Sequence, residues 1–208
     1  ARRRADRRRR DVSGALEDRI IDETLAHLRR HGAGRTTVLS IAQALGVSHA
    51  ALYRYFPSKA ELFDAATARA LRPLEDELRA IVEAPDPAGD KLERIIHALN
   101  RAYRGACLND PELFELMAKA AVEGRGIGRK HRARAQAAVQ RVVEEGIGSS
   151  AFAVADARRG VAFVFDALHR FIHPVSVGLD RDAPNAAIQQ RLDRVMRVVA
   201  RALTSGRI

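Results

Sequence analysis

The segment from residue 36 to residue 62, TTVLSIAQALGVSHAALYRYFPSKAEL, most constrains how this chain can fold. Apolar residues recur at helical spacing after Thr37, whose hydroxyl can accept a backbone N–H bond and start a helix. Gly46 then ends that helix, because glycine adopts the left-handed conformation without a Cβ clash. Ser48 is placed to cap a second helix over residues 49–56, which Pro57 ends. The pattern predicts two short helices joined by a tight turn.

The second of these helices carries side chains suited to a DNA duplex. Leu52 and Phe56 are four residues apart and point into the core, which leaves outside His49, Ala50, Tyr53, Arg54 and Tyr55. An arginine can bind a phosphate or a guanine, tyrosine hydroxyls can bond phosphates, and an alanine permits close approach to a thymine methyl. Two helices joined by a glycine turn also occur in all-α proteins without a DNA function. We favour DNA binding because the outward face agrees with the local charge.

The charge around this segment has one sign. Between Thr24 and Ala60 the chain has five basic residues and no Asp or Glu, although the whole chain has 26 acidic against 36 Lys and Arg residues. A polyanion would therefore meet no carboxylate from this window. Ser58, followed three residues later by Glu61, is a capping-box pattern for a third helix, whose Lys59 would lie beside the DNA backbone.

An arginine-rich stretch precedes the first helix. Residues 1–10, ARRRADRRRR, contain seven arginines and one aspartate. We expect a disordered arm over residues 1–13, because so charged a segment buries too little apolar surface to fold. Such an arm can follow phosphates or enter a narrow minor groove, and any basic tail strengthens nonspecific binding. Both alternatives stay open.

The same segment resembles the DNA-binding signature of the TetR (tetracycline repressor) family of bacterial transcription regulators. The positions that match are Ile41, Ala42, Gly46, Val47, Ser48, Leu52, Tyr53, Tyr55, Phe56, Lys59 and Leu62. The resemblance covers about residues 14–63 and implies a preceding helix, about Gly14 to His31, that Gly32 ends. It implies DNA contacts by Thr37, Ser48, His49, Tyr53, Tyr55 and Lys59, with Ala50 and Arg54 facing the groove. The recognition helix begins with neither glycine nor lysine, so the resemblance implies no particular operator.

The remainder of the chain has helical patterns and nothing that indicates strands. The patterns run over residues 59–83, 91–107, 111–122, about 130–145, 154–173 and 186–204. Pro73 lies inside the first and should kink or restart it. The sequence thus predicts an all-α protein, with an N-terminal three-helix helix-turn-helix DNA-binding domain over 14–63. The resemblance implies that the remaining helical residues, 64–208, form a larger C-terminal domain for effector binding and dimerisation.

The last two predicted helices have the clearest apolar patterns. The final one has a single apolar stripe opposite its arginines, and the helix before it is apolar on two sides, which requires two packing surfaces. A deeply buried helix in a monomer is the alternative. In the resembled family these helices pair with their twins, which implies a homodimer with contacts at Phe163, Phe165, Ala167, Phe171, Leu192, Met196 and Val199. Two recognition helices about 34 Å apart would then fit an inverted-repeat operator in double-stranded DNA.

The resemblance also implies a repressor released by a small organic effector, whose identity the residues do not indicate. Candidate contacts in the middle helices are His97, Asn100, Tyr103, Phe114 and Met117. The first three follow one another at intervals of three residues and can share a helix face, yet ordinary core residues have the same spacing. Core packing is therefore the alternative reading for each aromatic residue.

Other functional classes find little support in the sequence. His169 and His173 have the i, i+4 spacing of metal ligands, but no third ligand is evident, so we expect hydrogen bonding or capping and no metal. GRGIGRK lacks the spacing of a phosphate loop, and no nucleophile motif is present, so neither a cofactor nor an enzyme is expected. A single cysteine, Cys107, and the lack of an apolar leader or membrane span predict a cytoplasmic protein without membrane contact. An architectural DNA-binding protein, suggested by the arm and a pI near 10.8, is the rival class.

Overall fold

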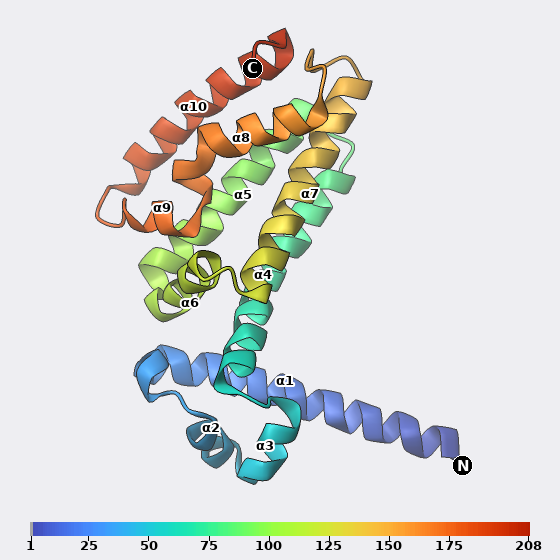
Figure 1. Ribbon diagram of the computed structural model, residues 1–208, viewed down its shortest axis with the longest axis vertical. Helices are drawn as coiled ribbons and strands as arrows, with labels where there is room; N and C mark the ends of the chain where they lie inside the picture. Colours follow the sequence, from blue (N-terminus) through green and yellow to red (C-terminus); the bar gives the residue numbers. More distant parts are fainter. Residues whose placement is uncertain (1) are drawn as a thin grey trace. The chain divides into compact units, whose positions relative to one another are not determined.

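The computed structural model describes the backbone of residues 2–208 and the side chains from Gly14 onward. The described residues form helices α1 to α10 and no strand, so the predicted all-α class is confirmed (Figure 1). The chain divides into two compact units, residues 1–70 and 71–208. The expected boundary at 63/64 lies a few residues earlier in the same helix, α4 (Lys59–Glu83). The sequence predicts a disordered arm over residues 1–13, whereas the described backbone of residues 2–13 is helical and continuous with the helix expected from Gly14; the side chains of these residues are not described.

Unit 1 contains α1 (Arg2–Arg35), α2 (Val38–Leu45), α3 (His49–Tyr55) and the first part of α4 (Lys59–Glu83). Gly32 interrupts α1 with φ 77° and ψ 165°, at the residue where the sequence predicts that the helix ends. Helices α1, α2 and α3 and the start of α4 pack around one apolar cluster, formed by Ile20, Ile21, Val38, Ile41, Ala42, Leu52, Phe56 and Leu62. Burial of this cluster is what holds such short helices in place, because isolated helices of this length are marginal in water.

Local hydrogen bonds set the ends of the short helices. The Thr37 hydroxyl accepts from the Ser40 N–H at 3.0 Å, and the Ser40 hydroxyl accepts from the Thr37 N–H at 3.0 Å, which makes a capping box. Gly46 ends α2 in the left-handed conformation with φ 65°. Ser48 caps α3 by accepting from the Ala51 N–H at 3.1 Å. These caps and the turn glycine agree with the sequence prediction.

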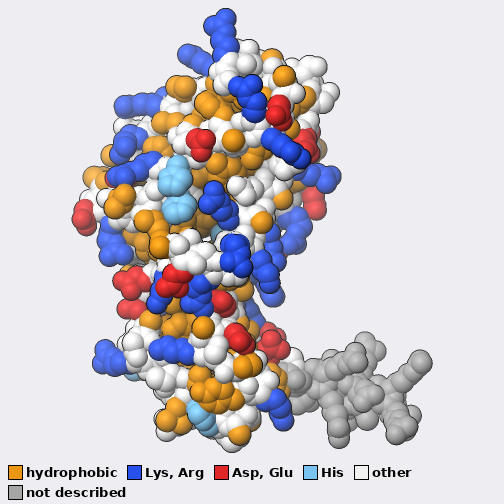
Figure 2. All heavy atoms as spheres, in the orientation of Figure 1, with side chains coloured by type: hydrophobic (Ala, Val, Ile, Leu, Met, Phe, Trp, Pro, Cys, Tyr) orange, Lys and Arg blue, Asp and Glu red, His pale blue; other side chains and the backbone are white. Residues whose placement is uncertain are grey.

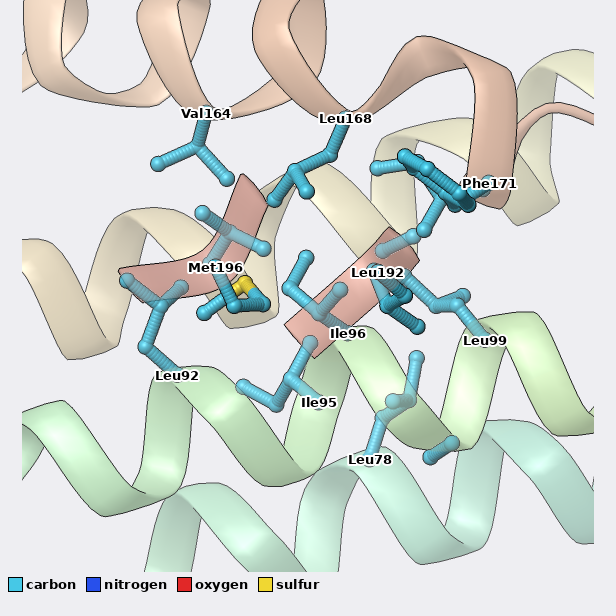
Figure 3. Packing of buried hydrophobic residues seen from close by; sticks show 14 of the residues in the cluster. Leu78, Leu92, Ile95, Ile96, Leu99, Val164, Leu168, Phe171, Leu192 and Met196 are labelled. Atoms are coloured by element: carbon cyan, nitrogen blue, oxygen red, sulfur yellow. The ribbon is translucent and has the colours of Figure 1, made fainter. Parts of the chain in front are cut away.

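Unit 2 contains the rest of α4 with α5 (Ala88–Asn109), α6 (Pro111–Val122), α7 (Gly126–Gly148), α8 (Ala157–Ile172), α9 (Pro174–Gly178) and α10 (Asn185–Ser205). Figure 1 shows α8 beside α10, and α5 packs against α6, α7, α8 and α9. Its core draws side chains from α4, α5, α8 and α10, as Figure 3 shows for Leu78, Leu92, Ile95, Ile96, Leu99, Val164, Leu168, Phe171, Leu192 and Met196.

Three details of unit 2 differ from the sequence prediction. α4 continues through Pro73 instead of restarting, because Leu71, Leu74 and Leu78 keep one buried stripe across the proline. α9 forms within a stretch predicted as a connector, with Pro174 at its first position, where a missing N–H costs nothing. α8 begins at Ala157 rather than at residue 154, because the carboxylate of Asp156 accepts the Arg158 N–H at 2.8 Å and caps it.

Candidate nucleic-acid interface

Helix α3 presents one face to the core and the opposite face to solvent. Leu52 and Phe56 are buried, at 0% and 5% exposure, and anchor the helix. The residues on the other face are exposed, namely His49, Ala50, Tyr53 and Arg54, while Tyr55 is half-buried. The residues predicted to face DNA are therefore brought together on one accessible surface, except for the ring of Tyr55, which also packs against the unit 1 cluster.

Contacts with aromatic rings restrict the orientation of the exposed side chains of α3. The ring of His49 meets that of Tyr53 edge-on, with centroids 4.6 Å apart at 89°. The guanidinium carbon of Arg54 lies 5.6 Å from the centroid of the Tyr55 ring. Such contacts are modest in energy, about 0.5–1.5 kcal/mol each, but they restrict side chains that would otherwise lose freedom on meeting a ligand.

The start of α2 belongs to the same candidate surface. Thr37 is exposed, and its capping role places the positive end of the α2 dipole beside it. Leu39, which the sequence analysis did not single out, is 51% exposed. The exposure of Leu39 could have been predicted from the sequence, because Leu39 lies outside the stripe of Val38, Ile41 and Ala42 that faces the core. An exposed leucine here can contact a sugar or a thymine methyl.

Lys59 occupies a more restrained position than a simple phosphate contact requires. Its ammonium donates to the carbonyl oxygen of Ala33 at 2.8 Å and lies 5.0 Å from the centroid of the Phe63 ring. This bond ties the start of α4 to the end of α1. An ammonium group has three donors, so two remain for a phosphate.

Hydrogen bonds to α1 fix the position of Thr36, in the segment that leads into α2. The Thr36 hydroxyl donates to the Gly32 carbonyl at 2.8 Å and accepts from Nδ1 of His27 at 3.0 Å. Burial, helped by the neighbouring His31 and Arg30, lowers the pKa of His27. A neutral imidazole with its proton on Nδ1 meets these requirements.

Three acidic side chains of α1 pair with arginines of α1 and α4. Asp18 and Asp22 both pair with Arg69, the latter at 2.9 Å, and Glu23 pairs with Arg30 at 2.6 Å. On unit 2, Figure 2 shows Lys and Arg side chains interspersed with Asp and Glu over the visible face. The carboxylate-free window around α3 is therefore more informative than the net charge of +10.

The five effector candidates do not line one open pocket. Tyr103, Phe114 and Met117 are packed in the core of unit 2. Asn100 is fully buried and bonded on both sides, donating to the Phe171 carbonyl and accepting from the Gln189 amide, each at 2.8 Å. His97 lies instead on a surface groove between α5 and α10.

Tyr103 belongs to a buried polar chain that the sequence analysis did not identify. Its hydroxyl lies 2.8 Å from Nε2 of His131, whose Nδ1 lies 2.9 Å from a carboxylate oxygen of Glu75, and Arg134 donates to the other oxygen at 2.5 Å. Because the carboxylate only accepts, His131 carries its proton on Nδ1 and accepts from Tyr103. Burial lowers the pKa of His131 and raises that of Tyr103. The members come from α4, α5 and α7, so no sequence spacing indicates the chain.

The predicted dimer contacts fall into two groups. Phe171, Leu192, Met196 and Val199 are at most 4% exposed and lie inside the protomer's own core. Their side chains therefore have no free face for a second copy. Phe163, Phe165 and Ala167 are half-buried, and Val198 of α10 is 64% exposed.

His169 and His173 lie against each other, with ring centroids 4.5 Å apart at 15°. Nδ1 of His169 lies 3.1 Å from the Ser176 hydroxyl, and the backbone N–H of His173 closes the end of α8. Among the described residues, no group of three or more potential ligands has the geometry for a metal ion. No helix in the same part of the chain is long and apolar enough to cross a membrane.

Unit 1 has a helix-turn-helix in which α3, the helix after the turn, exposes one face to solvent. Unit 2 is entirely helical. This combination defines a class, the two-part helix-turn-helix regulators. Comparison of the sequence with protein families gives the same result. The profile described as "Bacterial regulatory proteins, tetR family" matches residues 20–66, and "Tetracyclin repressor-like, C-terminal domain" matches residues 88–196. The chain therefore belongs to the TetR family of bacterial transcription regulators.

Individual relatives resemble parts of the chain. The nucleoid occlusion factor SlmA from Vibrio vulnificus (strain YJ016) is 41% identical over 75 residues, which cover 35% of this chain and 37% of SlmA. The HTH-type transcriptional repressor KstR from Rhodococcus jostii (strain RHA1) is 33% identical over 102 residues, which cover 49% of this chain and 45% of KstR. These alignments span less than half of each relative.

Solved structures resemble almost the whole chain. The regulator FadR from Bacillus subtilis, in complex with stearoyl-CoA, superposes with a TM-score of 0.60 at 18% identity, covering 90% of this chain and 97% of FadR. A protein of unknown function from Rhodococcus sp. RHA1 gives a TM-score of 0.66 at 23% identity, covering 91% and 95% of the two chains. At these identities the likeness concerns the fold alone.

Proposed function

We propose that this chain is a transcriptional repressor that binds an inverted-repeat operator as a homodimer and leaves it when a small organic effector binds. The observation that carries the proposal is the exposed face of α3, where His49, Ala50, Tyr53 and Arg54 project from a sequence window without carboxylates. A duplex meets donors and a positive charge on this face, and no negative charge from that window.

The contacts divide by chemistry. Arg54 can bind a guanine edge, Ala50 can contact a thymine methyl, and His49 can donate to or accept from a base, so these three read sequence. Thr37, Ser48, Tyr53, Tyr55 and Lys59 offer hydroxyl or ammonium donors for phosphates, which fix the register of the helix without reading bases.

Dimerisation is supported by the surface of α8 and α10. Phe163 and Phe165 of α8 are half-buried, and Val198 of α10 is largely exposed, so apolar area remains outside the protomer's core. To meet successive major grooves on one face of the duplex, the second copy must place its α3 about 34 Å from the first, one turn of the duplex away. The operator is then an inverted repeat.

Effector control is assigned to unit 2. A small molecule that binds one spacing of the two α3 helices better than another shifts the dimer toward that spacing and changes DNA affinity. The neighbour FadR holds stearoyl-CoA in a fold of the same kind, and KstR is a repressor, which supports ligand-controlled repression.

Selection of duplexes from a random pool with the purified protein, at fixed salt, tests the DNA-binding part of the proposal. We expect one inverted repeat to be enriched and to bind more tightly than random DNA by roughly 4 kcal/mol or more. Comparable affinity for every duplex would overturn the proposal in favour of an architectural protein. A reporter gene with the selected repeat inside its promoter tests repression, because a repressor lowers its expression.

A further inference from the structure

A groove of about 410 Å³ runs along the surface of unit 2 between α5 and α10. Its floor is apolar, formed by Leu92 of α5, Met196 of α10 and Phe152 of the connector before α8, each at most 5% exposed. Figure 3 shows Leu92 and Met196 approaching each other at one end of the core cluster. A groove of this volume is within the range that receives drug-sized molecules.

The connector that closes one end of the groove is firmly held. The N–H of Phe152 donates to the Gly146 carbonyl at 3.0 Å, and the next N–H donates to the Leu203 carbonyl at 2.9 Å. A Cβ on Gly146 would overlap the Phe152 ring, so the ring lies directly on the glycine. The apolar floor at Phe152 is therefore already formed without a ligand.

The rim of the groove has a different chemistry. Nε2 of His97 lies 3.5 Å from a carboxylate oxygen of Asp193 and 3.7 Å from one of Glu93. In the part of the chain that the structure describes, His97 is the only basic side chain recorded within ion-pair distance of either carboxylate. Arg197 also lines the groove, so the permanently charged side chains of the lining are two carboxylates and one guanidinium.

We propose that this groove binds a small organic cation, with an apolar body on Leu92, Phe152 and Met196 and a protonated amine that donates to Glu93 and Asp193 beside the His97 ring. Attraction to two carboxylates over an apolar floor favours a cation over a neutral or anionic molecule of equal size. The buried core candidates Tyr103, Phe114 and Met117 would have to unpack first, whereas this groove is already accessible.

A regulatory role for this groove rests on the proposed function, in which the bound cation would be the effector that releases the repressor from DNA. The groove is bounded by α10, which also carries the exposed Val198 proposed for the dimer. Ligand binding itself is measured without DNA. Loss of cation binding and loss of operator selection are therefore separate results.

The test is calorimetric titration of the full chain with three probes of similar size: 4-phenylbutylammonium, 4-phenylbutanol and 4-phenylbutyrate. We expect the ammonium to bind best and the carboxylate worst. The double variant Glu93→Gln with Asp193→Asn should weaken ammonium binding by about fivefold to tenfold, since each exposed charge contributes modestly. Glu144→Gln, an exposed neutralisation on α7 away from the groove, should leave the affinity unchanged.

A filling variant tests the location without removing core atoms. A Cβ on Gly89, which lines the groove, meets no atom within 4 Å, so Gly89→Leu fits the fold and fills the space. It should abolish binding of the ammonium while circular dichroism stays unchanged. Equal affinity for all three probes, unaltered binding by the double variant, or full binding by Gly89→Leu would each overturn the assignment.

Discussion

At the scale of single residues, the proposed DNA interface assigns base reading to some side chains of α3 and phosphate contacts to others. Arg54→Ala should relax the base preference at one operator position and cost about 1–3 kcal/mol on the preferred sequence. Tyr53→Phe, which keeps the ring beside His49 and removes only the hydroxyl, should weaken binding to all duplexes alike. Competition among operator variants measures both. An unchanged preferred sequence with Arg54→Ala would refute the base-reading role.

The stability of unit 1 should depend on glycine at position 46, in the turn between α2 and α3. Gly46 has φ 65°, and a Cβ there meets no neighbouring atom, so Gly46→Ala isolates the cost of the backbone conformation. We expect a loss of about 1 kcal/mol in the free energy of unfolding. Gly34→Ala is the matched control, because its Cβ also meets no atom and its φ is not positive. Urea unfolding followed by circular dichroism makes the comparison, and equal effects would contradict the turn argument.

His131 should make stability depend on pH. Burial lowers its pKa in the folded chain below the ordinary value near 6.5, so the unfolded chain binds the proton more readily. The free energy of unfolding should therefore fall as pH drops below about 6.5, by at most about 1.4 kcal/mol per pH unit. Urea unfolding between pH 5 and pH 8 measures the slope.

The variant His131→Gln isolates this contribution from those of other histidines. It should reduce the slope, whereas His97→Gln, on the surface groove, should retain it. Identical slopes for the native chain and His131→Gln would contradict the prediction.

At the scale of elements, one buried arginine organises the connection between α9 and α10. Arg104 of α5 donates to the carbonyls of Asp180 and Ala183, at 2.9 and 2.5 Å, and to the Asn185 side chain at 2.5 Å. Arg170 adds a bidentate pair with Asp180, at 2.7 and 2.8 Å, which lowers the pKa of that carboxyl. The connector is thus held by charged donors rather than by a regular helix.

Arg104→Met should therefore destabilise unit 2 strongly. It leaves carbonyls without their donors, and we expect a loss of roughly 2–4 kcal/mol in the free energy of unfolding. Arg101→Met is the matched control, because Arg101 lies three residues earlier on α5 in an exposed pair with Glu77. That change should cost under about 1 kcal/mol. Thermal unfolding of the two variants side by side distinguishes them, and similar losses would show that the buried clamp contributes little.

At the scale of the whole molecule, the proposed homodimer depends on the exposed apolar area of α8 and α10. Val198→Asp places a charge on this area without entering the core, so it should shift the protein toward monomer and weaken operator binding. Gln190→Asp, an exposed change on the same helix, is the control. Sedimentation velocity measures the assembly state. A dimer unaffected by Val198→Asp would place the interface elsewhere.

Local features of unit 1 were predictable from the sequence because they depend on residues a few positions apart. The caps at Thr37 and Ser48 and the turn at Gly46 need only a nearby hydroxyl or a missing Cβ. The outward face of α3 follows from the helical period once Leu52 and Phe56 are assigned to the core. The all-α class follows from the same periodicity along the chain.

Features that join distant segments were decided only by the tertiary structure. The apolar stripe of Leu192, Met196 and Val199 indicates burial but not the partner, and the fold places it in the protomer's own core. Tyr103, His131 and Glu75 come from three helices, and the groove at His97 forms only where α10 approaches α5. Periodicity specifies which side of a helix is apolar. Which surface covers that side depends on how the helices pack together, and no spacing along the chain encodes that packing.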